Sequence, residues 1–437
     1  MKYINRFLLL SLLLVFFVVA GCEDRSELNQ PSAPSTGQVS FERFVVMGNS
    51  LTAGYQSGSL YQSAQVFSFS KQIANLVSAK FEQPLASDPG LGSRIEVASV
   101  SPFALKTNKS VGAPINLSYA APYNNLGVPG AFVYDIVNTT KTADSYTAKA
   151  GSLNPIFDVV LRGQGSAFRQ AKAQKPTMLF CWIGNNDILG HATSGGTVPL
   201  TDPNVFGALW KQLADSLGSL NTKVVIANIP SVTSIPFFTT IPPATKNPAN
   251  GQIILFYGQT KTGVRQLVIG QDLVTLQASA LLTDASGNPT GVGLSPTKPL
   301  PDAVVLDKDE VAIVKTTVAS YNQTLATLAA SKGFAIVDIN TFFNNVAANG
   351  IVVDGTKFTA EFVNGGLFSL DGVHPSNQGY AIVANEFIKA INLKWGSNIP
   401  AINVATVPGS LVLAKKVTTS LLGTPIIPKG TLDNLLF

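Results

Sequence analysis

The sequence predicts a three-layer α/β fold, in which helices cover both faces of one doubly wound parallel sheet. Short apolar runs with the length of buried strands recur along the chain, and segments with helical periodicity lie between them. Apolar residues form 46% of the 437 positions and charged residues only 13%, so the chain can bury a large core. Strands that alternate with helices favour a parallel sheet with helices on each side.

The first residues have the pattern of a bacterial export signal. Lys2 and Arg6 precede an apolar run that ends at Ala20, and the small Gly21 follows. The run is shorter than the roughly 20 residues that a membrane-spanning helix needs, which favours a cleaved signal over residues 1–21. An uncleaved anchor helix is the alternative, and both interpretations predict that the rest of the chain is exported.

Four residues at the predicted cleavage point resemble the lipobox of bacterial lipoproteins: Val19-Ala20-Gly21-Cys22. That resemblance implies that Cys22 is acylated and begins a mature protein anchored in the bacterial cell envelope, at the outer membrane. Several acyl chains on one residue anchor a protein stably, whereas a single chain binds a membrane only marginally. Residues 22–40 are rich in breakers and polar residues and are expected to form a flexible tether.

Composition excludes several classes of partner and cofactor. The formal net charge is +5, and removing the two cations of the signal leaves about +3 without any basic run, so no nucleic-acid partner is predicted. If Cys22 carries lipid, Cys181 has no cysteine partner, and its apolar surroundings in the sequence indicate a buried core thiol. With two histidines and no cysteine pair at ligand spacing, no metal site is expected.

The expected core elements follow from these patterns in chain order. Apolar runs predict buried strands over Phe44–Met47, Thr177–Ile183, Val224–Ile229 and Phe334–Val337. Helical periodicity predicts helices over about Phe206–Leu217, Asp309–Ala330 and Asn377–Leu393. The second of these helices has acidic residues in its first turn, and Gly333 lies just beyond its end, as expected of a helix stop.

Two stretches interrupt the alternation of strands and helices. Residues 231–305 are rich in Pro, Gly and Thr and contain β-like runs such as Ile253–Tyr257, and residues 396–437 have a similar composition. Long segments of this kind in a compact domain are usually covers or small subdomains. We therefore expect one domain over residues 41–395 with a β-rich insertion at 231–305, and a β-rich C-terminal extension, 396–437, packed on it.

Ser50 follows the first predicted strand, in the sequence Gly48-Asn49-Ser50-Leu51. Ligands of open α/β sheets bind at the carboxyl ends of the strands, so this serine is predicted to lie at the binding edge. The start of a following helix would supply backbone N–H groups that stabilise an oxyanion. Taken alone, a serine in such a turn is more often a helix cap.

Two glycine-containing motifs add polar groups at the same predicted edge. Gly127 lies in a glycine-rich turn, where the backbone can approach a ligand closely. Asn186 lies in Gly184-Asn185-Asn186-Asp187, directly after the second predicted strand, where an amide side chain can donate a hydrogen bond to developing negative charge. Singly, the first motif is an ordinary turn and the second an Asx turn.

A candidate general base lies near the start of the last predicted helix. Asp371 precedes His374 by three residues, and a turn of that size can bring the carboxylate to one ring nitrogen while the other faces a serine. The second histidine, His191, is expected in a polar Gly/Thr/Ser loop and has no carboxylate at comparable spacing. His374 is therefore the preferred base.

Together, the four motifs resemble the SGNH, or GDSL, hydrolase family, and they occur in the family's order along nearly the whole ordered chain. The resemblance implies a flavodoxin-like three-layer fold and an ester hydrolase without a cofactor. It implies that Ser50 is the nucleophile of a catalytic triad with Asp371 and His374. It also implies that Ser50, Gly127 and Asn186 form the oxyanion hole.

One position departs from the family's Gly-Asp-Ser-Leu pattern, because Asn49 stands where the aspartate is expected. Asparagine keeps an acceptor oxygen and loses the charge, and the family's aspartate is not a triad member, so catalysis is expected to survive with altered loop stability. The predicted substrates are carboxylic esters of a lipid or of an acylated glycan. The alternative function is a catalytically silent envelope lipoprotein that binds glycan or lipid in the same cleft.

Overall fold

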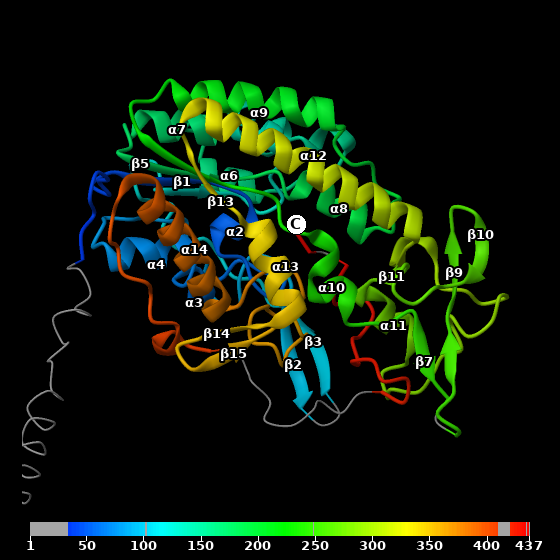
Figure 1. Cartoon of the computed structure of the whole chain (residues 1–437). Coiled ribbons are helices and arrows are strands. Elements are labelled where there is room, and N and C mark those ends of the chain that lie inside the picture. The colour runs from blue at the N-terminus through cyan, green and yellow to red at the C-terminus, as the bar shows by residue number, and fades with distance from the viewer. Residues whose placement is uncertain (1–33, 101–102, 248, 410–419, 434, 437) are drawn as a thin grey trace, which may run out of the picture.

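The computed structural model describes residues 34–437 except 101–102, 248, 410–419, 434 and 437 (Figure 1). The predicted signal, Cys22 and most of the predicted tether lie outside the described residues. Within the described part of the chain, none of the helices combines the length and the apolar character that crossing a membrane requires.

The core of the molecule is a five-stranded parallel sheet, which confirms the predicted fold class. Its strands, in spatial order, are β13 (Ala335–Val337), β6 (Lys223–Ala227), β5 (Met178–Trp182), β1 (Phe44–Gly48) and β4 (Asn125–Gly127). The register pairs Gly48 with Gly127 on one side and with Trp182 on the other. The segments that follow β4, β1 and β5 therefore leave the sheet at the same edge.

Helices cover both faces of this sheet (Figure 1). On one face, α9 (Pro203–Gly218) packs along α12 (Lys308–Lys332), and on the other α4 (Phe69–Leu76) packs against α14 (Asn377–Trp395). The three predicted helices are thus present, and each is slightly longer than predicted. The remaining helices are α2 (Ser50–Ala53), α3 (Gln62–Gln65), α5 (Val133–Asn138), α6 (Ile156–Leu161), α7 (Ala167–Ala173), α8 (Asn186–Thr193), α10 (Pro236–Thr239), α11 (Ser279–Leu282) and α13 (Ile339–Asn349).

The long helix α12 has strong signals at both ends. The Asp307 side chain accepts hydrogen bonds from the first turn while Glu310 bonds back to the Asp307 N–H, which forms a capping box. Gly333 ends the helix in the left-handed conformation, with φ of 70°. In the middle of the helix, the Tyr321 ring stacks on Phe206 of α9 with centroids 3.6 Å apart. The stacked rings pack α12 against α9, and the caps define where α12 begins and ends.

The insertion at residues 231–305 contains three two-stranded antiparallel sheets, as its β-like composition predicts. They pair β7 (Ala244–Lys246) with β8 (Ile253–Leu255), β9 (Tyr257–Thr260) with β10 (Gly263–Gln266), and β11 (Leu273–Val274) with β12 (Val305–Leu306). Two further hairpins lie outside the insertion: β2 (Arg94–Val100) with β3 (Phe103–Asn108), and β14 (Ile351–Val353) with β15 (Thr356–Phe358). The predicted run Ile253–Tyr257 is divided between β8 and β9 at the fully buried Phe256.

Three local features differ from the sequence predictions. Strand β4 lies where only a glycine-rich turn was expected. The end of the predicted tether is packed rather than flexible, because Ser35 exchanges backbone hydrogen bonds with Asn398 and Val39 is buried. The described residues of the C-terminal extension are not rich in strands: they contain the 3-10 helix η7 (Val404–Thr406) and two isolated bridges, from Asn398 to Ser35 and from Ile426 to Ala104 of β3.

Candidate active site

Ser50 is held where β1 turns into the short helix α2. The side-chain oxygen of Asn49 caps that helix by accepting a hydrogen bond from the Leu51 N–H at 3.1 Å. Gly48 must be glycine, because a Cβ there would lie 2.3 Å from the Trp182 carbonyl oxygen of the neighbouring strand. This close approach of β1 and β5 delivers Ser50, which is 2% exposed, to the carboxyl edge of the sheet.

Asp371 and His374 form a buried pair at the same edge. The His374 Nδ1 atom lies 3.0 Å from Asp371 Oδ2, and both side chains are almost completely buried. The Asp371 carboxylate also accepts hydrogen bonds from the N–H groups of Val373, His374 and Gly58 and from the Ser369 hydroxyl. Burial opposes ionisation, but His374 and these donors outweigh it, so the pKa of Asp371 lies below its usual value.

The structure holds the His374 ring in place from several sides. The Tyr55 ring lies 4.9 Å from the imidazole, centroid to centroid, and the Tyr380 hydroxyl donates a hydrogen bond to the Tyr55 carbonyl oxygen. Just after the histidine, the Ser376 side chain caps α14 by accepting a hydrogen bond from the Gly379 N–H. Because Asp371 occupies Nδ1, the other ring nitrogen remains for an exchange of protons with a substrate or nucleophile.

A small cavity of about 40 Å³ joins the predicted residues. Ser50, Asn186 and His374 all line it, and Asp371 lies behind the histidine. The rest of the lining is mainly apolar and comes from separate parts of the chain: Leu51, Leu189, Pro230, Val232, Ile235, Phe343, Phe368, Val373 and Pro375. The structure thus brings together three segments that the sequence predicted separately, in a cavity of the size of a short acyl group.

Asn186 is the first residue of α8 and points its amide toward the loop after β4. Its Nδ2 donates a hydrogen bond of 2.8 Å to the Ala131 carbonyl oxygen, which leaves the second amide hydrogen free to bind a ligand.

The structure does not place the Gly127 N–H in the cavity, which differs from the prediction. That N–H donates to the Asn125 side-chain oxygen at 2.9 Å, and Gly127 does not line the cavity. A Cβ at this position would lie 2.7 Å from the Ala53 nitrogen, so the glycine is required for the packing of β4 on α2. The next glycine, Gly130, has φ of 80°, and its N–H makes no hydrogen bond to the described residues.

Sequence reasoning did not assign a role to Asn185, although it lines the cavity. Its side-chain oxygen accepts a hydrogen bond of 3.0 Å from the Asn49 Nδ2. Because the Asn49 oxygen is bound to the Leu51 N–H, Asn49 must present its nitrogen to Asn185, and Asn185 must present its oxygen in return. The Asn185 Nδ2 is therefore buried at the cavity, without a hydrogen-bond partner among the described residues. The signal in the sequence that could have pointed to Asn185 is Asn49, which stands where the family has aspartate.

Two other reactive side chains lie away from this cavity. The prediction that His191 lies in a loop is wrong: it is buried in the helix α8, where its Nδ1 lies 2.6 Å from the Val198 carbonyl oxygen. Cys181 lies in β5 and is fully buried, and burial raises the pKa of its thiol far above the usual range, as expected of a core thiol. The described residues contain no cluster of three or more His, Cys, Asp or Glu side chains that could hold a metal ion.

A serine at the carboxyl edge of a parallel sheet, lining one cavity with a histidine that is paired with a buried carboxylate, matches the class of serine hydrolases. Comparison with protein families agrees, since the model of the GDSL-like lipase/acylhydrolase family matches residues 44–387. The chain belongs to this family, and it is a hydrolase of ester bonds.

Several solved structures are similar to the chain at low identity. An acetylxylan esterase from Geobacillus stearothermophilus shares 14% identity, with a TM-score of 0.35 over 81% of this chain and 95% of that one. A structure described as a GDSL-like lipase, from Parabacteroides merdae, shares 13% identity, with a TM-score of 0.32 over 81% of this chain and 99% of that one. Comparison with curated proteins gives no match.

Proposed function

We propose that the protein is a serine esterase of the bacterial cell envelope that works through an acyl-enzyme, with Ser50, His374 and Asp371 as its triad. The observation that carries this proposal is the 3.0 Å contact between His374 Nδ1 and Asp371, behind a cavity that His374 shares with Ser50. The substrates are carboxylic esters of a lipid or of an acylated glycan. The export and lipobox patterns that end at Cys22 support the envelope location.

In the proposed reaction, His374 accepts the Ser50 proton as the serine oxygen attacks the ester carbonyl. Asp371 orients the imidazole and stabilises its charged form. The proton then passes from His374 to the departing alcohol oxygen, and the acyl group remains on Ser50. A water molecule, deprotonated by His374, attacks this acyl-enzyme and releases the carboxylic acid, which restores the serine.

The oxyanion that forms in each step would be stabilised by donors around the same cavity. We assign this role to the Ser50 N–H, the second amide hydrogen of Asn186 and the unpartnered Nδ2 of Asn185. Donors that are fixed before the reaction stabilise the transition state without a cost of reorganisation. Gly127 is not assigned to the oxyanion hole, because its N–H donates to the Asn125 side chain. In the loop after β4, the Gly130 N–H is the backbone donor without a partner among the described residues.

Hydrolysis of p-nitrophenyl acetate, butyrate and octanoate by the purified protein and by Ser50→Ala tests this proposal. Ser50→Ala should lower kcat by roughly a thousandfold or more while the folded structure persists. Because the cavity is only about 40 Å³, kcat/KM should fall from acetate to octanoate. Equal rates in the two proteins, with no labelling of Ser50 by a fluorophosphonate, would instead support the silent binding lipoprotein.

A further inference from the structure

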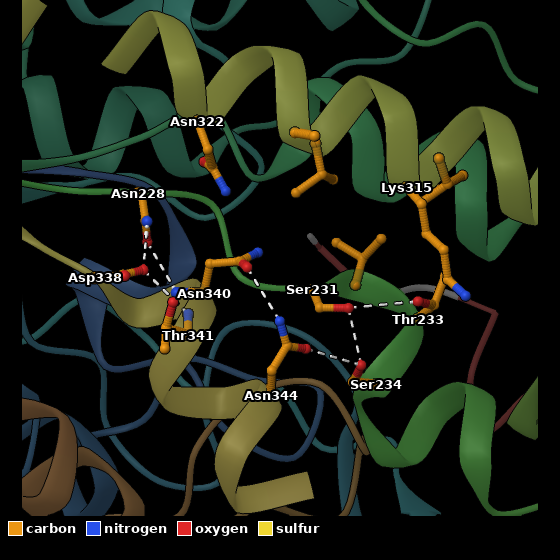
Figure 2. A pocket seen from close by; sticks show the side chains of 14 residues that line it. Asn228, Ser231, Thr233, Ser234, Lys315, Asn322, Asp338, Asn340, Thr341 and Asn344 are labelled. Carbon is orange, nitrogen blue, oxygen red and sulfur yellow. Dashed lines mark hydrogen bonds between the residues drawn. The ribbon is translucent and has the colours of Figure 1, made fainter. Parts of the chain in front are cut away.

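Figure 2 shows a second, much larger hollow, of about 550 Å³, which we call the polar hollow; the cavity that Ser50 and His374 line is called the catalytic cavity. Three segments line it: α12 from Val314 to Asn322, the segment after β6 with Asn228 and residues 231–234, and residues 338–344 at the start of α13. Val232 lines both this polar hollow and the catalytic cavity, so the two spaces meet at one side chain. A molecule bound in the polar hollow would therefore lie next to the reacting ester.

Amide and hydroxyl side chains dominate the lining of the polar hollow, as Figure 2 shows. They are ordered by their own hydrogen bonds, because Asn344 donates to Asn340 and accepts from Ser234, which in turn contacts Ser231 at 2.8 Å. Hydrogen bonds of this kind fix the side chains before a ligand arrives, which lowers the entropic cost of binding.

The lining retains groups that can bind a ligand. The side-chain nitrogens of Asn340 and Asn344 each use one hydrogen in a hydrogen bond within the protein and keep a second for a ligand. The Asp338 carboxylate likewise has acceptor sites beyond those used by Asn228 and Thr341. Lys315 reaches the hollow from α12 and makes no ion pair with the described residues (Figure 2). The negative charge of Asp338 and the positive charge of Lys315 balance each other, so the charged groups of the lining favour neither an anionic nor a cationic ligand.

The floor of the polar hollow is apolar, with Val232, Val314 and Val318. Many hydrogen-bonding groups around an aliphatic floor are complementary to a sugar, which carries hydroxyl groups at its rim and C–H groups on its ring faces. A fatty chain would instead leave the remaining hydrogen-bonding capacity of these amides and hydroxyls unmet, at a cost for each polar group that it buries.

We propose that the polar hollow binds the sugar unit of an acylated glycan, with the short acyl group in the catalytic cavity. This inference rests on the proposed function and selects the glycan from the two substrate classes given there. The bond between the acyl carbon and the sugar oxygen breaks as Ser50 is acylated. The sugar oxygen takes its proton from His374 and leaves through the hollow, and water then releases the acid from Ser50.

The test compares ethyl acetate with mono-O-acetylated xylotriose and cellotriose as substrates of the purified protein. At least one acetylated trisaccharide should have a kcat/KM about tenfold or more above that of ethyl acetate. Lys315→Ala and Asn344→Ala should lower this ratio, and Ala319→Tyr, which places a ring in the hollow, should lower it further. The matched control is Ala330→Tyr, an exposed position of the same helix outside the hollow, which should leave the ratio unchanged.

Two outcomes separate this inference from the proposed function. In the first, Ser50 is required for hydrolysis of p-nitrophenyl acetate, but neither trisaccharide ester has a higher kcat/KM than ethyl acetate, or Ala319→Tyr does not change the ratio of the two kcat/KM values. That result would overturn the sugar subsite and leave the esterase intact. Absence of Ser50-dependent hydrolysis of any ester would overturn the proposed function itself.

Discussion

At the scale of single residues, the pairing of Asn49 with Asn185 sets the chemistry of one wall of the catalytic cavity. An aspartate at position 49 would have no hydrogen to donate, so it would face the Asn185 oxygen as a second acceptor. The Asn185 amide would then have to turn, which would direct its nitrogen to residue 49 and its oxygen into the cavity. Asparagine at 49 therefore determines that Asn185 presents a donor to the site.

We expect Asn185→Ala and Asn49→Asp to lower kcat on p-nitrophenyl acetate by roughly a hundredfold, because each removes one donor to the oxyanion. The two changes act on the same donor, so the double variant should be no slower than the slower single variant. Thermal unfolding by circular dichroism serves as the control for folding. Unchanged turnover in folded Asn185→Ala would remove this residue from the mechanism.

At the scale of elements, the sheet positions Ser50, the proposed nucleophile, through close contacts between backbones. The glycine at the end of β4 lies against the first turn of α2, the helix that carries Ser50. There is no room for a methyl group at Gly127, whereas Gly190 in α8 has no atom within 4 Å of an added Cβ. Close packing requires glycine at position 127 but not at position 190, so alanine substitutions at the two positions can be compared directly.

Gly127→Ala should destabilise the protein by about 1–3 kcal/mol through overpacking, and it should also lower kcat because α2 must move. Gly190→Ala should raise stability by about 0.5–1 kcal/mol, since alanine favours a helix interior. Urea unfolding at equilibrium measures both free energies. If Gly127→Ala folded and catalysed like the native protein, the packing of β4 on α2 would not determine the position of Ser50.

The sequence was sufficient to predict the elements with long, regular signals. The strands that begin at Phe44, Met178, Lys223 and Ala335 are apolar runs, and α12 has both of its caps. Strand β4 was missed because it has only three residues, one of them Gly127. The motifs predicted Ser50, Asn186 and His374, which line one cavity in the structure, but which N–H of the glycine-rich loop is free depends on the hydrogen bond from Gly127 to Asn125, which no motif specifies.

At the scale of the whole molecule, a buried acid links three helices on one face of the sheet. Asp187 of α8 accepts hydrogen bonds from the Val133 N–H at the start of α5 and from the Thr201 hydroxyl, and the Tyr321 hydroxyl of α12 donates to the Thr201 carbonyl oxygen. Burial raises the pKa of Asp187 to about 7, although both hydrogen bonds lower it. The stability of this junction therefore depends on pH.

Since the pKa of Asp187 is higher in the folded state than in the unfolded state, the folded protein binds more protons between pH about 4 and 7. The free energy of unfolding should thus fall as the pH rises through this window. Asp187→Asn should reduce the difference in unfolding free energy between pH 5 and pH 8, as measured with urea. A difference as large in Asp187→Asn as in the native protein would assign the pH dependence to other groups.

The contact between Asp371 and the N–H of Gly58 joins positions that are 313 residues apart in the chain. During synthesis, a nascent chain that already carries Ser50 lacks the proposed base and the proposed orienting acid until residue 374 has left the ribosome. The proposed triad therefore predicts that every shorter translation product is inert toward esters, whatever part of the sheet it has formed. Hydrolytic activity would report that synthesis has passed residue 374, so its appearance marks the moment when the two ends of the domain meet.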